Sequence, residues 1–372
     1  MPQNVRLLDY QSATIDPSTK HYFHGYHQEF VMNQSSSQAS VQKRRVAVTL
    51  PAGPQVSDTI TRVKWAEANG YTDAWFADAG APDALTTAAA LASETSTLRI
   101  GVAVTPVFTR TPAVLAATAN TLGQLLPGRF VMGLGSSSQT MMENWHGQEF
   151  GKPLTRVKNT AIMVRSILNG EKSNFDLDGL RSHGYSQAQM DNPPPIYIAA
   201  LRSKMIEMAT EVGDGVIFNL WPQRALPWMI EHAKHGAQNA GKDWTNVEIV
   251  NRAMVLITDD KASARDLFRA AFAPYYATPV YNAFLAWAGF TEAAQTITEG
   301  WAARDRAKTG GALSDAMVDE IAVIGSADEC RERLIADMAA GIDTQIISPL
   351  AGASEADIER TFEAFSGNNF TP

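Results

Sequence analysis

The chain has 372 residues and a formal net charge of -8 at pH 7. An acidic chain without a run of lysine and arginine is not typical of proteins that bind nucleic acid or anionic membranes, so we expect a small-molecule partner. The single cysteine, Cys330, excludes an internal disulfide framework, and the start of the chain carries no apolar signal segment. We therefore expect a cytoplasmic protein that does not span a membrane, with an inert thiol at Cys330.

The first part of the chain differs from the rest in composition. Residues 1–43 are polar, rich in Ser and Gln, and show neither helical nor strand periodicity. Such a segment buries too little apolar surface to fold alone, so we expect a flexible N-terminal extension. Residues 44–372 carry a regular pattern, and we expect one domain over that range.

Apolar runs of strand length alternate with amphipathic segments of helix length from Arg45 onward, as in consecutive βα units. The apolar runs predict eight strands, over residues 46–50, 74–77, 99–105, 130–134, 196–200, 215–218, 248–257 and 344–347. The other segments predict helices over residues 58–68, 83–94, 112–125, 153–168, 203–211, 222–239, 261–273 and 327–339. A last helix starts at the capping residue Ser354. Strands without polar alternation fit a parallel sheet covered by helices, so we predict an α/β fold, the (β/α)8 TIM barrel, with an open doubly wound sheet as the alternative.

Two segments are longer than the connections of such a barrel require. Residues 169–195 follow the fourth strand and end in three prolines, and residues 274–319 follow the seventh strand and begin with an aromatic-rich stretch. Long insertions in a compact domain are commonly lids or binding walls. For the second segment, a helical subdomain packed on its neighbour is the alternative.

The fourth strand breaks into Gly133-Leu134-Gly135 followed by three serines that start at Ser136. Glycines at the end of a strand let backbone approach a ligand closely, and the serines add hydroxyl and N–H groups without a strong acid or base. This stretch therefore indicates a cofactor site, with a plain Gly-Ser turn as the alternative.

The turn after the fifth strand carries Arg202, Ser203 and Lys204 at the start of a predicted helix. A helix start presents free N–H groups and a positive dipole end, so two cations at this point predict a phosphate-binding site. An ordinary capped helix with surface cations is the alternative.

The predicted strand ends offer no cluster of histidines and carboxylates for a metal, and no interior lysine suited to a Schiff base. We therefore predict no metal site. A site with glycines, hydroxyls and a phosphate pocket fits a cofactor that brings its own reactivity.

Four stretches carry a family resemblance: GVAVTPVFTRTPAVLAATANTLGQL, GRFVMGLGSSS, EFGKPLTRVKNTAIMVRSIL and PPPIYIAALRSKMIEMATEVGDGVIFN. They resemble the luciferase-like family of flavin-dependent oxidoreductases over about residues 45–350. Within that family they are most similar to the branch that uses the deazaflavin coenzyme F420, which includes methylenetetrahydromethanopterin reductase. Other branches use FMN as monooxygenases, often with a flavin reductase partner.

The resemblance implies a barrel with an insertion after the seventh strand and a flavin-type ring across its mouth. It also implies a non-prolyl cis peptide bond behind the ring, at Ala103–Val104. The residues that it places at the cofactor are Ala103, Val104, Thr105, Gly133, Gly135, Ser136, Ala200, Arg202, Ser203 and Lys204.

The sequence departs from the family at three places. The turn after the fifth strand has Arg202-Ser203-Lys204 where Gly-Pro-Lys is commoner, which leaves the detailed phosphate geometry open. Asp78 is followed by Ala79 where many relatives have histidine. Ser136 occupies the place of the glutamate found in the sugar-phosphate dehydrogenases, so a glucose-6-phosphate-type reaction is not expected.

Asp78, after the second strand, is the one acid that we nominate as catalytic, with a helix-capping or buried structural carboxylate as the alternative. Asn219 and Trp221 are predicted to contact the ring or the substrate. The resulting hypothesis is hydride transfer between coenzyme F420 and a small organic substrate, in a homodimer. The alternatives are an FMN-dependent monooxygenase acting with a flavin reductase, and a non-catalytic flavin-binding barrel.

Overall fold

The computed structural model describes residues 44–49 and 55–372. The extension expected over residues 1–43 lies outside the described residues. Among the helices of the described ranges, none is both long enough and apolar enough to cross a membrane.

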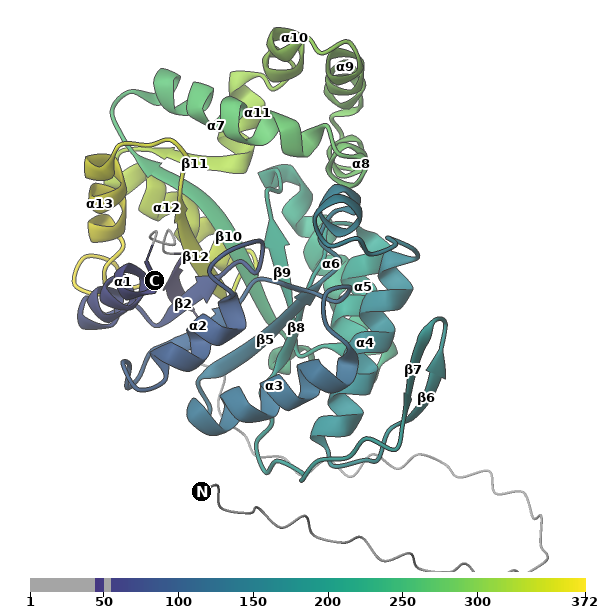
Figure 1. Ribbon diagram of the computed structural model, residues 1–372. Helices are drawn as coiled ribbons and strands as arrows, with labels where there is room; N and C mark the ends of the chain where they lie inside the picture. The colour runs from purple at the N-terminus through teal and green to yellow at the C-terminus, as the bar shows by residue number, and fades with distance from the viewer. Residues whose placement is uncertain (1–43, 50–54) are drawn as a thin grey trace, which may run out of the picture. The chain divides into compact units, whose positions relative to one another are not determined.

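Eight parallel strands form the centre of the fold, each buried along most of its length (Figure 1). They are β1 (Arg45–Val48), β2 (Asp73–Phe76), β3 (Arg99–Val102), β5 (Phe130–Gly135), β8 (Ile196–Ala199), β9 (Gly215–Asn219), β10 (Glu248–Ile257) and β12 (Thr344–Pro349). The pairings run from β10 through β12, β1, β2, β3, β5 and β8 to β9, and β9 pairs again with β10, so the sheet closes on itself. The predicted (β/α)8 barrel is confirmed, and the open doubly wound sheet is excluded.

Helices surround this barrel in the order that the sequence predicts. They are α1 (Val56–Ala68), α2 (Ala84–Leu91), α3 (Pro112–Leu125), α4 (Pro153–Leu168), α5 (Ser203–Val212), α6 (Leu226–Asn239), α12 (Ala327–Ala339) and α13 (Glu355–Ala364). Several begin at a side chain that accepts a hydrogen bond from the first turn, as Asp83 does for α2, Thr111 for α3 and Ser326 for α12. Such caps satisfy N–H groups that have no partner within the helix.

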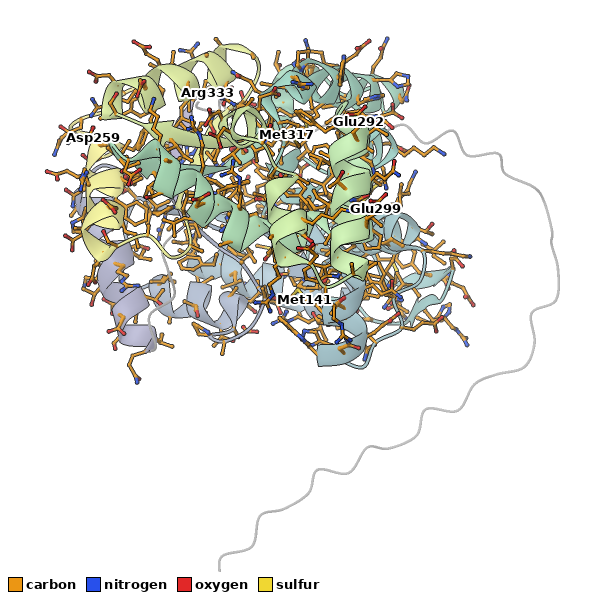
Figure 2. The ribbon with its side chains drawn as sticks, turned by 90° about the horizontal axis from the view of Figure 1, so that it is seen from above. Met141, Asp259, Glu292, Glu299, Met317 and Arg333 are labelled. Carbon is orange, nitrogen blue, oxygen red and sulfur yellow. The ribbon has the colours of Figure 1, made fainter. Side chains whose placement is uncertain are left out.

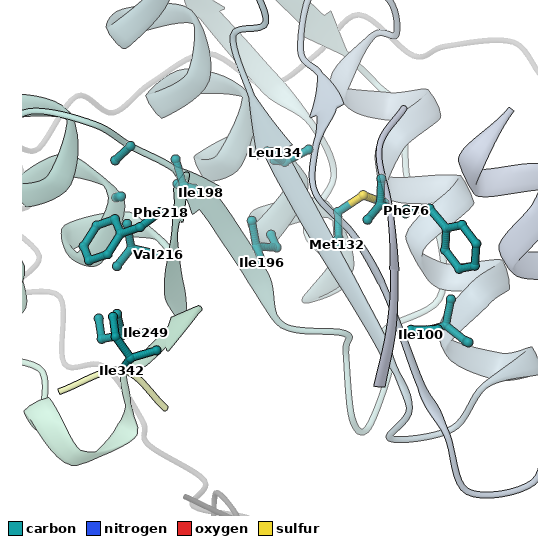
Figure 3. Packing of buried hydrophobic residues seen from close by; sticks show 14 of the residues in the cluster. Phe76, Ile100, Met132, Leu134, Ile196, Ile198, Val216, Phe218, Ile249 and Ile342 are labelled. Atoms are coloured by element: carbon teal, nitrogen blue, oxygen red, sulfur yellow. The ribbon is translucent and has the colours of Figure 1, made fainter. Parts of the chain in front are cut away.

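The main hydrophobic core lies between the outer face of the barrel and these helices. Figure 3 shows side chains from successive strands in this core, among them Ile100, Met132, Leu134, Ile196 and Phe218. Alternate residues of the same strands point into the barrel, because side chains alternate along a strand. Cys330 is buried in the outer core, and burial raises the pKa of its thiol to about 12, which agrees with the inert thiol expected.

The third strand differs from its prediction as one continuous run over residues 99–105. β3 ends at Val102, and a separate two-residue strand, β4 (Thr105–Pro106), pairs with β5. The break falls at Ala103–Val104, and the cis peptide bond predicted there is present.

The first insertion contains a feature that the sequence analysis did not predict. Residues 169–195 contain an antiparallel hairpin of β6 (Asn174–Leu177) and β7 (Leu180–His183), seen at the side of the barrel in Figure 1.

A short π-helix, Met141–Trp145, lies between β5 and α4. Two 3-10 turns, Gln223–Ala225 and Trp244–Asn246, flank α6.

The second insertion is a helical subdomain, as the alternative hypothesis stated. The insertion supplies α8 (Pro279–Trp287), α9 (Thr291–Ala302), α10 (Arg306–Gly311) and α11 (Asp315–Ile321), and the predicted helix before it, α7 (Lys261–Tyr276), packs with them. These helices share a second hydrophobic core, and Figure 2 looks onto them, with Glu292 and Glu299 marking α9 and Met317 marking α11. The insertion ends in an unpredicted strand, β11 (Ala322–Gly325), which pairs with the second half of β10.

An ion-pair network closes the amino end of the barrel. The guanidinium of Arg99 lies 2.8 Å from a carboxylate oxygen of Asp73 and 2.6 Å from one of Glu248, and Arg45 lies 2.5 Å from Asp73. Burial alone would raise the pKa of Glu248, but the charge of Arg99 and hydrogen bonds to the carboxylate lower it to about 2. Because paired charges fill this end, we expect a ligand at the carboxyl ends of the strands.

Candidate active site

The bulge between β3 and β4 brings backbone and small side chains to the inside of the barrel. Ala103, Val104 and Ala199 pack against a cluster of inward-facing residues. That cluster is Ala47, Trp75, Val131, Tyr197, Ile217, Val250 and Ile346. Ala103 and Val104, two of the predicted cofactor contacts, therefore lie at the barrel interior.

Two glycines of β5 leave the space that this bulge occupies. A Cβ atom on Gly133 would lie 1.7 Å from the carbonyl oxygen of Val102, and one on Gly135 would lie 2.4 Å from Cγ2 of Val104. Both distances are far shorter than a van der Waals contact, so only glycine fits at either position. We expected these glycines to make room for a cofactor, and in the structure they make room for the neighbouring strand.

Two other predicted contacts face the outer core. Thr105 pairs in register with Leu134, whose side chain lies in that core, and Ala200 packs there as well. Only the backbone of Thr105 and Ala200 is therefore available to the barrel interior. Ser136 is half-buried, and its hydroxyl donates to the carbonyl oxygen of Ser137 at 3.2 Å.

The amino end of α5 has the features expected of an anion site. Arg202 is the extended residue that precedes the helix, and no side chain caps this end. Arg202 and Lys204 are exposed, and neither forms an ion pair within the described part of the chain. The first turn of α5 also contains no acidic residue, so its positive dipole end is not neutralised locally.

Asp78 is held by an arginine that the sequence analysis did not single out. Nη1 of Arg110 lies 2.5 Å from Oδ2 of Asp78, and the other terminal nitrogen of Arg110 pairs with Asp83. The side chain of Asp78 is 8% exposed. This geometry favours the alternative hypothesis for Asp78, a structural carboxylate, over a free acid. The string TPVFTRTP already contains Arg110, but its partner is 32 residues away in the chain.

The two predicted ring or substrate contacts, Asn219 and Trp221, lie on opposite sides of the sheet. Asn219 ends β9 and pairs in register with Arg252, and its Nδ2 donates to the hydroxyl of Tyr281 at 2.9 Å. Trp221 is 4% exposed, packs in the outer core, and donates from Nε1 to Asn251 at 2.7 Å. The structure therefore brings Asn219 to the barrel mouth and turns Trp221 away from it.

Arg252 is a further residue at the mouth that the sequence analysis passed over. It lies on β10 two residues after the inward-facing Val250, so it also points into the barrel. The signal in the sequence is one cation in the middle of the strand sequence EIVNRAMVLI. We read that run only as a strand.

The structure thus combines a closed barrel, a bulge in the third strand and a helix after the fifth strand whose start has no side-chain cap. The sequence model of the luciferase-like monooxygenase family matches residues 33–344, and the chain belongs to this family. The family predicted from the four sequence stretches is thereby confirmed.

Two curated relatives are similar along most of the chain. A 5,10-methylenetetrahydromethanopterin reductase of Methanolobus tindarius is 29% identical over 312 residues, which cover 82% of this chain and 95% of the relative. A putative coenzyme F420-dependent oxidoreductase of Mycobacterium tuberculosis is 28% identical over 319 residues, which cover 78% of this chain and 89% of the relative.

A solved structure supports the fold. The coenzyme F420-dependent tetrahydromethanopterin reductase of Methanopyrus kandleri superposes with a TM-score of 0.72 at 19% identity, covering 87% of this chain and 97% of that one. At this identity the likeness shows the shared barrel.

Proposed function

We propose that the protein is an oxidoreductase that uses coenzyme F420 and transfers a hydride between this cofactor and a small organic substrate. The observation that carries the proposal is the bulge at Ala103–Val104, which enters the barrel interior beside Gly135. The family membership and the coenzyme F420-dependent relatives support the choice of cofactor.

The residues present fit such a cofactor. Arg202 and Lys204 stand unpaired, within the described ranges, at the uncapped start of α5, where a cofactor phosphate would find two charges and free N–H groups. The small apolar side chains of Ala103, Val104 and Ala199 suit contact with one face of a ring. When bound, the deazaflavin ring would supply the hydride chemistry.

The chain's own residues would then bind and orient rather than transfer protons. Backbone at Ala103–Val104 would limit how deeply a ring enters the barrel, and the amino end of α5 would fix the phosphate. Arg110 would hold the carboxylate of Asp78 in place at the mouth through their ion pair. Asp78 and Ser136 are proposed to line the site, with Asn219 on the substrate side.

An FMN-dependent monooxygenase is the second candidate, because the family takes its description from monooxygenases. That protein would need reduced flavin from a flavin reductase partner. We also propose a homodimer, which sedimentation of the purified protein would check.

Titration of the apo protein with coenzyme F420 and with FMN, followed by fluorescence, tests the proposal. We expect tighter binding of coenzyme F420. Micromolar binding of FMN without detectable binding of coenzyme F420 would move the protein to the monooxygenase group. Binding of either cofactor without turnover of any reductant or oxidant would favour the non-catalytic flavin-binding barrel.

A further inference from the structure

The half-buried arginines at the two ends of the barrel differ in their partners. At the amino end, Arg45 and Arg99 lie against the carboxylates of Asp73 and Glu248. At the carboxyl end, Arg252 forms no ion pair within the described residues. Its one hydrogen bond there runs from Nη2 to the hydroxyl oxygen of Ser348, at 3.0 Å.

Arg252 lies at the level of the barrel where β9 ends. It pairs in register with Asn219, the last residue of β9, and with the inward-facing Ile346 of β12. Its guanidinium therefore points into the interior near the mouth and not toward the surrounding helices.

An unpaired guanidinium in this position is costly to the folded protein. Burial lowers the pKa of Arg252, while the phenols of Tyr275 and Tyr281 act in the opposite direction. Arginine nevertheless remains charged at neutral pH, so the cost of a desolvated charge is not relieved by loss of a proton. No carboxylate is among the groups that act on Arg252.

Tyr281 does not supply the missing negative charge. Burial raises the pKa of its phenol, so the hydroxyl stays protonated at neutral pH. Tyr281 belongs to α8 of the helical insertion and packs edge-on against Tyr276, with ring centroids 6.0 Å apart. Its oxygen accepts from Nδ2 of Asn219, and its own proton has no acceptor among the described residues.

Asn219 adds an acceptor to this group. Its Oδ1 is buried and has no hydrogen-bond donor in the described part of the chain. A buried polar atom without a partner costs about 1 to 3 kcal/mol, so a donor from a ligand would stabilise it. The three side chains together present one positive charge, one O–H donor and one carbonyl acceptor.

We propose that Arg252 and Tyr281 form an oxyanion subsite that binds a carboxylate or phosphate group of the substrate, with Asn219 accepting from a neighbouring hydroxyl or N–H group. This inference rests on the proposed function, because it assigns the substrate side of the same mouth. It also gives the helical insertion a role, since α8 contributes one of the two donors.

The test uses the full-length protein and two probe anions, acetate and inorganic phosphate, at constant ionic strength with chloride as the counter-anion. The thermal unfolding temperature of the protein is measured at increasing concentrations of each anion. We expect a saturable rise for the wild type and at least about a tenfold weaker apparent affinity in Arg252→Met, the factor that corresponds to about 1.4 kcal/mol. Arg252→Lys should retain part of the affinity, and Tyr281→Phe should lose a few-fold.

Two controls separate this subsite from the cofactor phosphate site. The double variant Arg202→Ala, Lys204→Ala should bind coenzyme F420 more weakly but keep its thermal response to acetate. Arg252→Met should keep its affinity for coenzyme F420 and lose the thermal response to acetate. Without anion, Arg252→Met should be at least as stable as the wild type, because it removes an uncompensated charge.

Three results would overturn the subsite. The first is a wild type that responds to neither probe. The second is an Arg252→Met protein that loses coenzyme F420 together with acetate, which would assign Arg252 to the cofactor. The third is an Arg252→Met protein that is destabilised without anion and keeps its response to acetate. A wild type that binds acetate through Arg252 but not coenzyme F420 would refute the proposed function and leave the subsite standing.

Discussion

The carbonyl oxygen of Val102 occupies the space that a Cβ atom of Gly133 would need, at a distance of 1.7 Å. The end of β3 and the middle of β5 therefore approach each other as closely as backbone allows. Because the bulge after Val102 forms one wall of the barrel mouth, the identity of residue 133 bears on both stability and ligand binding.

Gly133→Ala is expected to destabilise the protein by about 1 to 3 kcal/mol, the range seen when a methyl group is forced into a packed interior. Chemical denaturation measures this free energy of unfolding. Gly310→Ala is the matched control, since no atom lies within 4 Å of a Cβ added there and the residue is helical. That control should stabilise the protein slightly. Equal effects of the two substitutions would contradict the packing found at Gly133.

The double substitution Arg202→Ala and Lys204→Ala is expected to weaken binding of coenzyme F420 by about 2 to 4 kcal/mol, because each charge-assisted contact contributes roughly 1.5 to 3. The free energy of unfolding should hardly change, since both side chains are exposed and unpaired within the described ranges. Fluorescence titration gives the affinity. Unchanged affinity would place the cofactor phosphate elsewhere.

The network at the amino end predicts a loss of stability in acid. The pKa of Glu248 is about 2 in the folded protein and 4.5 for a free glutamate, so its ionised form stabilises the fold above pH 4.5. That contribution, of about 3 kcal/mol, should fade as the pH falls from 4.5 toward 2. Denaturation of the wild type and Glu248→Gln across this range measures it. The variant should be less stable at neutral pH and show a flatter pH dependence; parallel curves would argue against the assignment.

Asp78→Asn separates a positioning role from proton transfer. If Asp78 only orients Arg110, the substitution should lower turnover without moving the acidic limb of the pH profile of kcat. Arg110→Ala should produce a similar loss through the same pair. A displaced acidic limb in Asp78→Asn would instead identify this carboxyl as a proton donor or acceptor.

A protein that begins at Val41 is expected to fold and to bind coenzyme F420 with the affinity of the full chain. The reason is that all eight barrel strands, from Arg45 onward, lie in the described residues that remain. Size-exclusion chromatography and the same titration would check it. Insoluble protein or lost binding would show that residues 1–40 contribute to the fold or the site.

Local signals in the sequence determined the barrel and its order. The strands are runs of mainly apolar residues that fit burial on both faces, and several helix starts have a capping residue, so both can be recognised without knowledge of distant contacts. The glycines of β5 and the cations at the start of α5 are also local signals in the sequence. The cis bond at Ala103–Val104 followed from the family resemblance and not from the local pattern.

Only the tertiary structure decided which polar groups meet. Trp221 lies two residues after the end of β9, and its indole donates to Asn251 in the outer core, whereas Asn219, the last residue of β9, faces the mouth. Asp78 has its partner 32 residues away, and Arg252 shares the mouth with Tyr281, which a separate helical insertion supplies. The side of a sheet on which a side chain lies depends on register and on where a strand ends, and a partner far along the chain leaves no periodic signal. Local pattern thus predicts the elements, while the charge balance of the site arises from their closure into one barrel.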